Sequence, residues 1–137
     1  MMKYLLSWVI AFALVSAIDG VWHLLIFKNR YRAGIERVAN VKNGKVAFKG
    51  ISALISQILV VTSIMILVLM VIGLGGSYQQ AAIVGALAGT LAISVYGLVN
   101  YALIKNWSLD ITILEVVWGP IIGASSGLLV AYLNNIL

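Results

Sequence analysis

Apolar residues fill four long stretches of the chain, and polar residues collect in the short segments between them. The stretches cover residues 4–27, 51–74, 81–104 and 109–133. Each is about 24 residues long, which gives about 36 Å of α-helix against a hydrocarbon core of about 30 Å. The apolar positions do not alternate with a period of two, which argues against a membrane barrel. We therefore expect four membrane-spanning helices.

The composition favours a single membrane domain over residues 1–137. Hydrophobic residues make up 63% of the chain, charged residues make up 9%, and the mean hydropathy is +1.09. Soluble domains contain about 25% charged residues, so a soluble fold of this chain would have too little polar surface. The predicted fold class is all-α, an integral membrane four-helix bundle. The chain has no cysteine, which excludes disulfides and thiol chemistry.

Basic residues are concentrated in the first connecting segment, residues 28–50. Seven of the nine basic residues lie there: Lys28, Arg30, Arg32, Arg37, Lys42, Lys45 and Lys49. Of the others, Lys105 lies in the third connection and Lys3 precedes the first span. Basic residues in short loops favour the cytosol, so we expect a multi-pass protein of the cell membrane with both termini outside. The seven side chains are candidates for contact with anionic lipid headgroups, or a topology signal alone; we expect no nucleic-acid partner.

The basic segment also contains an apolar pattern with helical spacing. Its members are Tyr31, Ile35, Val38 and Val41. Because Arg30 and Arg37 fall on the opposite side, the pattern predicts a short amphipathic helix in the cytosolic membrane interface. Asn43 and Gly44 predict a turn before the second span.

Glycines recur every four residues in the last two spans. They are Gly85 and Gly89 in the third span, and Gly119, Gly123 and Gly127 in the fourth. A stripe of this kind lets two helix backbones approach closely, which strengthens dispersion contact within lipid. We expect the third helix to pack on the fourth within one chain. Homodimerisation through the same stripes is the alternative.

Scarce polar side chains of all four spans are predicted to lie at similar depths, in a buried polar layer. Its predicted members are Asp19, Trp22, His23, Gln57, Tyr96, Asn100, Glu115 and Trp118. At about 1.5 Å per residue the ionisable and amide groups lie about 6 to 12 Å from the cytosolic helix ends. Asp19 and His23 are four residues apart and share a helix face. A carboxylate facing lipid is costly, so we expect the layer to face the bundle interior.

Several activities compete for this layer. Asp19, His23 and Glu115 are an acceptable ligand set for a first-row metal, although hydrogen bonding is the simpler interpretation of a single histidine. Ser16 lies seven residues from His23 with no nucleophile elbow, which disfavours acyl transfer. The outer halves of the spans contain no second ionisable group, which argues against conduction. We expect no catalytic residue, no metal and no cofactor.

Three motifs within these spans resemble one known family. They are Asp19-x-x-Trp22 followed by Tyr31, Tyr96-Gly-Leu-Val-Asn100, and LEVVWG from Leu114 to Gly119. Together they resemble domain of unknown function family 2177, small predicted membrane proteins with the same four-span layout. That family typically shows Tyr-Asp-x-Thr-Asn and Asp-x-x-Trp-Gly, where this chain has Gly97, Val99 and Glu115. The resemblance implies a fold and a polar layer and does not imply an activity.

The sequence favours a non-enzymatic function. Small size and apolar helix faces suggest an accessory or structural subunit that packs against other membrane subunits. A respiratory complex or a membrane-bound monooxygenase are examples of a host. The alternative is a small transporter or binding protein for a proton, cation or small amphiphile, using Asp19, His23 and Glu115. A membrane enzyme acting on lipids is the least favoured hypothesis.

Overall fold

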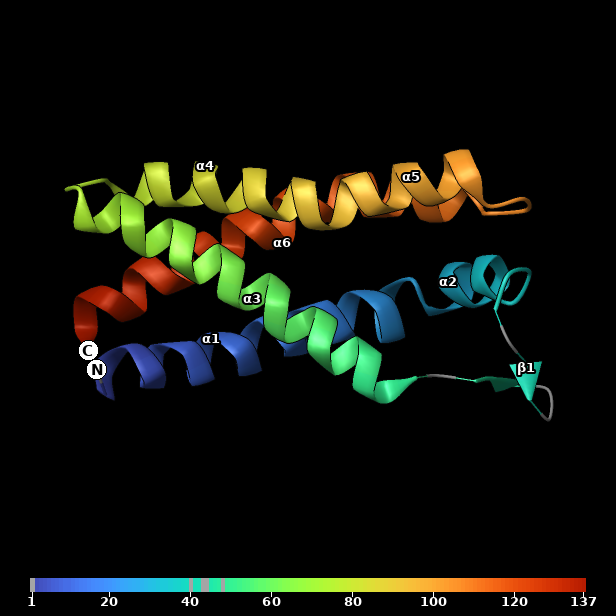
Figure 1. Cartoon of the computed structure of the whole chain (residues 1–137), viewed down its shortest axis with the longest axis horizontal. Helices are drawn as coiled ribbons and strands as arrows, with labels where there is room; N and C mark the ends of the chain where they lie inside the picture. Colours follow the sequence, from blue (N-terminus) through green and yellow to red (C-terminus); the bar gives the residue numbers. More distant parts are fainter. Residues whose placement is uncertain (1, 40, 43–44, 48) are drawn as a thin grey trace.

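Four long helices form the protein (Figure 1), and the computed structural model describes residues 2–39, 41–42, 45–47 and 49–137. The helical elements are α1 (Met2–Val21), η1 (Trp22–Ile26), α2 (Lys28–Ile35), α3 (Gly50–Gly73), α4 (Tyr78–Gly89), η2 (Thr90–Ser94), α5 (Val95–Leu103) and α6 (Leu109–Ile136). Two short strands in the first loop, β1 (Val41–Lys42) and β2 (Lys45–Val46), pair antiparallel. Four helices, α1 with η1, α3, α4 to α5, and α6, are long and apolar enough to cross a membrane. The predicted four-helix membrane bundle is confirmed.

Both termini lie at one end of the bundle, and the basic first loop lies at the other (Figure 1). The Lys3 ammonium donates a hydrogen bond to the Asn134 carbonyl oxygen at 2.8 Å, which joins the two terminal segments. The turn between α5 and α6 lies at the same end as α2. Lys105 is therefore near the first loop, and Lys3 is at the far end.

Local side-chain chemistry sets the starts of the last two spans. Ser77 and Gln80 form a capping box: the Gln80 side-chain oxygen accepts from the Ser77 N–H at 2.8 Å, and the Ser77 hydroxyl accepts from the Gln80 N–H at 3.3 Å. The third span therefore begins at Tyr78, earlier than the predicted residue 81. Ser108 caps α6, so the predicted start at Leu109 agrees with the structure.

Two spans that the sequence pattern predicts as uninterrupted α-helices each contain a π-helical segment. The first span ends in η1, and the third changes to η2 between α4 and α5. Within η2 the Thr90 hydroxyl donates to the Ala86 carbonyl oxygen at 2.8 Å. Hydrophobic periodicity does not resolve a single wide turn, and such turns are often found beside functional sites.

The amphipathic helix of the first loop is shorter than its apolar pattern predicts. α2 ends at Ile35, Val38 lies in the following turn, and Val41 belongs to β1. α2 can approach α6 closely at Gly34 because glycine has no side chain. A Cβ added at Gly34 would overlap the Ile111 side chain. α2 therefore packs on protein as well as facing outward. The turn predicted at residues 43–44 lies outside the described residues.

The glycine stripes of α4 and α6 face each other within the chain. A Cβ built at Gly85 or at Gly123 would overlap the carbonyl oxygen of the other residue, and one built at Gly89 would overlap that of Gly119. Gly127 faces Ala81 in the same way. We call the contact of these six residues the glycine seam. The seam brings the third span onto the fourth, backbone against backbone.

α1 and α3 complete the bundle on the other side of α6. The Trp8 indole N–H donates to the Thr62 hydroxyl at 2.9 Å, which joins α1 to α3. Val15, Ile64 and Ile122 belong to the buried core between α1, α3 and α6. α3 packs on α4, α6 and α1, but it makes no comparable contact with α5, because it crosses away from the third span toward the loop end (Figure 1).

Candidate functional site

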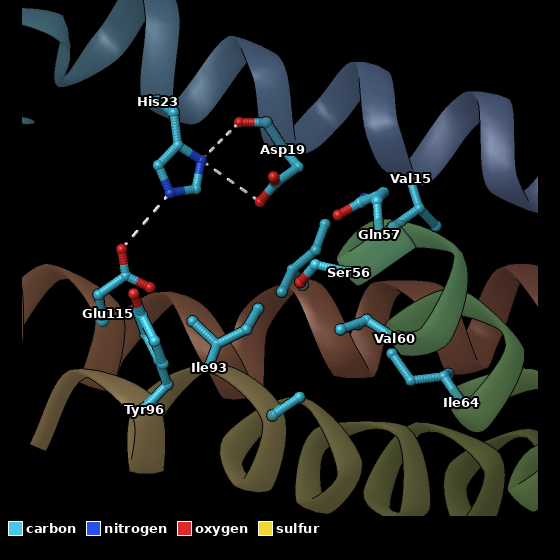
Figure 2. A pocket seen from close by; sticks show the side chains of 12 residues that line it. Val15, Asp19, His23, Ser56, Gln57, Val60, Ile64, Ile93, Tyr96 and Glu115 are labelled. Carbon is cyan, nitrogen blue, oxygen red and sulfur yellow. Dashed lines mark hydrogen bonds and ion pairs between the residues drawn. The ribbon is translucent and has the colours of Figure 1, made fainter. Parts of the chain in front are cut away.

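His23 lies between two carboxylates that come from different helices (Figure 2). Its Nδ1 is 2.9 Å from the Asp19 backbone carbonyl oxygen and 3.4 Å from the Asp19 carboxylate. Its Nε2 is 3.5 Å from the Glu115 carboxylate. A carbonyl oxygen can only accept a hydrogen bond, so Nδ1 carries a proton and donates a hydrogen bond to the Asp19 carbonyl oxygen. The imidazole thereby links α1 and η1 to the middle of α6.

Each carboxylate also accepts a hydrogen bond from an aromatic side chain. The Trp118 indole N–H donates to Asp19 at 2.7 Å, and the Tyr31 hydroxyl donates to Glu115 at 2.8 Å. The Trp22 indole N–H donates to the Tyr31 oxygen at 3.4 Å, which leaves the phenolic proton for Glu115. The result is a network with six members. We call it the polar cluster: Asp19, Trp22, His23, Tyr31, Glu115 and Trp118.

Stacked rings hold the two indoles of the polar cluster in place. The rings of Trp22 and Trp118 are 4.2 Å apart with an interplanar angle of 9°. The ring of His23 lies 4.4 Å from that of Tyr31 in a tilted arrangement. Since Trp22 and His23 are the first residues of η1, the π-helical turn presents both rings to α6 and α2.

Tyr31 is the member of the polar cluster that our predicted layer lacked. The pattern placed it on the apolar face of an interfacial helix, whereas it is 6% exposed and reaches Glu115 from α2. Burial, and after it the negative charge of Glu115, raise the pKa of the Tyr31 hydroxyl far above its ordinary value. The hydroxyl therefore stays protonated and remains a donor. The available signal was its position in the family-like motif with Asp19 and Trp22.

Ser94 is a second residue that the sequence analysis did not identify. Its hydroxyl lies 3.2 Å from the carbonyl oxygens of Glu115 and Val116. Pro120 lies within α6 and has no N–H, so the Val116 carbonyl lacks its usual helical donor four residues later. The Ser94 hydroxyl supplies that missing donor from η2. The contact fixes the position of η2 along the axis of α6, next to the backbone of Glu115.

A cavity of about 230 Å³ lies beside the polar cluster. Asp19, His23 and Glu115 form part of its wall, and Gln57 and Tyr96 contribute from α3 and α5 (Figure 2). The rest of the wall consists of Ser56 and six aliphatic residues: Val15, Val60, Ile64, Ala92, Ile93 and Ile122. The cavity thus has a charged side and an apolar side.

Three predicted members of the layer stand apart from the hydrogen-bonded network. Gln57 and Tyr96 line the cavity without a hydrogen bond to either carboxylate among the described residues. Tyr96 is 58% exposed and packs edge-on against Trp107. The Asn100 amide nitrogen is buried without a partner among the described residues. These three side chains lie at a depth similar to that of the carboxylates but form no hydrogen bond with them among the described residues. α3 and α5 are not in close contact at this level of the bundle.

The geometry is not that of a metal site. Among the described residues no group of three histidine, cysteine or acidic side chains could hold a metal ion. The imidazole itself separates the two acids, since one ring nitrogen faces Asp19 and the other faces Glu115. A metal ion would need both carboxylates beside the same imidazole nitrogen.

The basic residues of the first loop lie away from the polar cluster and are exposed wherever their side chains are described. These are Lys28, Arg30, Arg32, Arg37, Lys42 and Lys49. The Lys45 side chain lies outside the described residues. Arg32 pairs with Glu36 at 2.7 Å, and this hydrogen bond raises the pKa of Arg32. None of these six side chains lines the cavity, and their contact with lipid headgroups stays a prediction.

Comparison with known families assigns the chain. A family described as "Predicted membrane protein (DUF2177)" matches residues 4–132. The protein belongs to this family. The match covers all four spans and the whole polar cluster, and it supports an integral, multi-pass membrane protein. Searches of curated proteins and of solved structures find no significant match.

Two of the three positions where this DUF2177 chain departs from the pattern described above, Gly97 and Glu115, lie in contact. Gly97 lies against Glu115, and a Cβ built at Gly97 would be 2.9 Å from the Glu115 Cβ. The absence of a side chain at Gly97 therefore leaves room for the longer acid at Glu115. The Glu115 carboxylate lies 3.5 Å from the His23 Nε2 and accepts a hydrogen bond from the Tyr31 hydroxyl at 2.8 Å.

Proposed function

We propose that this protein binds a small amphiphile with a cationic head group in the cavity beside Asp19, His23 and Glu115. The single observation that carries the proposal is the two-sided wall of this cavity, with carboxylates on one side and aliphatic side chains on the other. Its volume of about 230 Å³ lies below the range of about 300 to 1,000 Å³ of typical drug-sized pockets. The cavity suits a head group and a short part of an apolar chain.

The charges of the cavity wall favour a cation. Two acids face one imidazole, so the wall contains more acidic side chains than basic ones. An ammonium group contributes N–H donors and positive charge, which is what the wall lacks.

The arrangement of the helices favours an amphiphile over a hydrated ion. α3 leaves the third span on the side where Gln57 and Tyr96 line the cavity, and Tyr96 is exposed. The surface there is apolar and belongs to helices that can span a bilayer. A molecule already dissolved in the membrane reaches the cavity from the side, and it keeps its chain in apolar surroundings.

The environment of His23 favours binding over catalysis. Both ring nitrogens face acids or a carbonyl oxygen, so neither is placed to activate a nucleophile. Among the described residues no serine or threonine hydroxyl forms a hydrogen bond with this imidazole. General base catalysis requires such contact with the group that loses its proton.

The accessory-subunit hypothesis draws less support from these contacts. It relied on small size and on apolar helix faces that could pack against partner helices, and the glycine seam covers the glycine-lined part of these faces within the chain. The outward apolar side chains that remain are what any lipid-facing helix carries. Gentle solubilisation followed by mass analysis of co-purifying chains tests this second function. Constant recovery with the same membrane subunits would favour it over ligand binding.

Intrinsic tryptophan fluorescence in lipid nanodiscs tests the binding function. The Trp118 indole donates a hydrogen bond to Asp19 and stacks on Trp22, so we expect an occupant of the cavity to change the emission of these two tryptophans. We expect a saturable change with decylamine and no such change with decanol, which has the same chain without the positive charge. Equal responses to the two compounds would overturn the proposal.

Matched variants locate the response. Asp19→Asn and Glu115→Gln each remove one carboxylate charge, and we expect decylamine affinity to fall about tenfold or more. Glu36→Gln removes the same charge from an exposed residue outside the cavity and should leave the affinity unchanged. If Glu36→Gln weakens binding as much as Asp19→Asn, the attraction is a property of the whole surface and the cavity has no special role.

A further inference from the structure

A second groove lies at the loop end of the bundle, between α2 and the turn that joins α5 to α6. Its volume is about 560 Å³, and its wall shares no residue with the cavity beside Asp19. The wall contains two arginines, two aromatic residues, a serine and one acid: Arg30, Arg37, Tyr101, Trp107, Ser108 and Asp110. The groove is therefore polar and carries an excess of one positive charge.

The two arginines retain most of their capacity to bind an anion. The Arg30 guanidinium is 4.0 Å from the Asp110 carboxylate and its side chain is 62% exposed, so this ion pair is loose. Arg37 has no carboxylate within 4.0 Å among the described residues. Arginine presents several N–H donors in a fixed planar fork that matches phosphate oxygens.

Two further donors lie in the same wall. The Trp107 indole N–H is buried and has no acceptor among the described residues. Ser108 caps α6 at the groove, so the first turn of a 28-residue helix begins there. The N-terminus of a helix directs its backbone N–H groups and its positive dipole end toward an anion. Asp110 lies in this first turn and offsets part of the positive charge of the helix end, so the two guanidinium groups and the indole carry the preference for an anion.

We propose that this groove binds a singly charged phosphate group, as in the phosphodiester of a membrane lipid. Asp110 in the wall opposes a second negative charge, which favours a phosphodiester over a phosphomonoester. Tyr101 and Trp107 are residues of the kind that anchor at the bilayer interface. The site is separate from the proposed amphiphile cavity, and neither proposal depends on the other.

Native mass spectrometry of the full-length protein in mild detergent tests the groove. The probe is phosphatidylglycerol, and the control lipid is diacylglycerol with the same chains and no phosphate. We expect the protein to retain phosphatidylglycerol at about tenfold higher occupancy than diacylglycerol. Inorganic phosphate is added in a second arm. Displacement of the lipid by inorganic phosphate would show that the groove binds free phosphate. That result would contradict a membrane lipid as the ligand, but it would support binding of a phosphate group.

Two double variants decide whether the binding is local. Arg30→Gln with Arg37→Gln removes both guanidinium groups of the groove, and we expect the preference for phosphatidylglycerol to fall about tenfold. Lys28→Gln with Arg32→Gln removes the same charge from the same basic segment, outside the groove, and should keep the preference. An equal loss in both double variants would overturn the proposal, because it would show general attraction by a basic loop.

Trp107→Phe gives an independent measurement that does not change the net charge. It removes the unpaired indole N–H and keeps an aromatic ring against Tyr96. We expect a smaller loss of phosphatidylglycerol preference, about threefold, with unchanged retention of diacylglycerol. An unchanged preference in this variant, together with an unchanged one in the Arg30 and Arg37 double variant, contradicts the site.

Discussion

The two halves of α6 make contact with their neighbours in opposite ways. From Gly119 to Gly127 the helix meets α4 with backbone against backbone, and no side chain separates them. From Ser108 to Trp118 it meets α1, α2 and η2 through hydrogen-bonded side chains, and a cavity remains beside them. One helix therefore combines a close-packed half with a polar half.

We expect the close-packed half of α6 to be rigid and the polar half to be the part that can bind a ligand. Dispersion contact between backbones falls steeply with distance, so the glycine seam permits only one spacing of α4 and α6. Hydrogen bonds between side chains span a wider gap and tolerate small movements of α1 and α2. Polar groups at such a gap also offer partners to a ligand. We expect an occupant of the cavity to change the polar half and to leave the glycine seam unchanged.

The largest effect is expected from adding a methyl group to the glycine seam. In Gly123→Ala the new Cβ meets the backbone of Gly85 and of Gly89, and neither can move without shifting a whole helix. We expect a loss of about 3 kcal/mol in the free energy of unfolding, measured by denaturation with SDS in mixed micelles.

Gly20 provides the matched control for the seam. It also lies within a spanning helix, but nothing is within 4 Å of a Cβ built there. Gly20→Ala should leave the stability unchanged or raise it by up to about 1 kcal/mol, because alanine favours the helix. If Gly123→Ala behaves like Gly20→Ala, α4 and α6 are not held by the seam.

A smaller loss is expected from breaking the polar half. Glu115→Ala leaves the buried Tyr31 hydroxyl without its acceptor and removes the acid beside the His23 Nε2. We expect the free energy of unfolding to fall by about 2 kcal/mol, and by less in Asp19→Ala because Asp19 is more exposed. Glu115→Gln keeps an acceptor and should lose less than Glu115→Ala. Wild-type stability in all three variants would remove the network as a source of stability.

The attachment of α2 to the polar half should depend on pH at alkaline values. Tyr31→Phe removes the donor to Glu115, and we expect a loss of about 1.5 kcal/mol near neutral pH. Since the pKa of Tyr31 is higher in the folded protein than in the unfolded chain, the unfolded chain ionises first as the pH rises past about 10. The stabilisation by Tyr31 is therefore present below that pH and is lost above it.

The measurement for Tyr31 compares two unfolding curves over a pH series. Wild-type protein should keep its advantage over Tyr31→Phe up to about pH 10 and lose it progressively at higher pH. Hydrogen exchange of the amides in α2 provides a local readout, because the variant should expose them sooner. A constant difference in stability across the whole series would show that the Tyr31 hydroxyl is not buried against a carboxylate.

The fold was predictable because lipid imposes simple conditions on sequence. A span must be apolar over its whole length, so the four predicted ranges agree with the helices to within a few residues. Glycines at intervals of four show which faces can approach closely, although they do not distinguish a partner in the same chain from one in another. The structure places Gly85 against Gly123 within the chain.

The site was only partly predictable, because depth is encoded in sequence and lateral position is not. Asp19, His23 and Glu115 meet because α1 crosses α6, whereas Gln57 and Asn100 at a similar height remain apart from them. Tyr31 was missed because it enters the bundle from a loop helix, and depth counted along a span does not include such a residue. Nothing in hydrophobic periodicity reports the π-helical turns that orient His23.

The smallest predicted effect concerns the boundary between the two halves of α6, at Ser94 and Pro120. Ser94→Ala removes the hydroxyl that reaches the Val116 carbonyl, and we expect a loss of about 1 kcal/mol. Pro120→Ala restores a backbone N–H four residues after Val116, so the helix itself can supply that donor. Ser94→Ala should then cost less in the Pro120→Ala background, and a double-mutant cycle of unfolding free energies measures the coupling. Additive losses would show that Ser94 does not replace the donor that proline lacks, and that the Glu115 carbonyl alone is its partner.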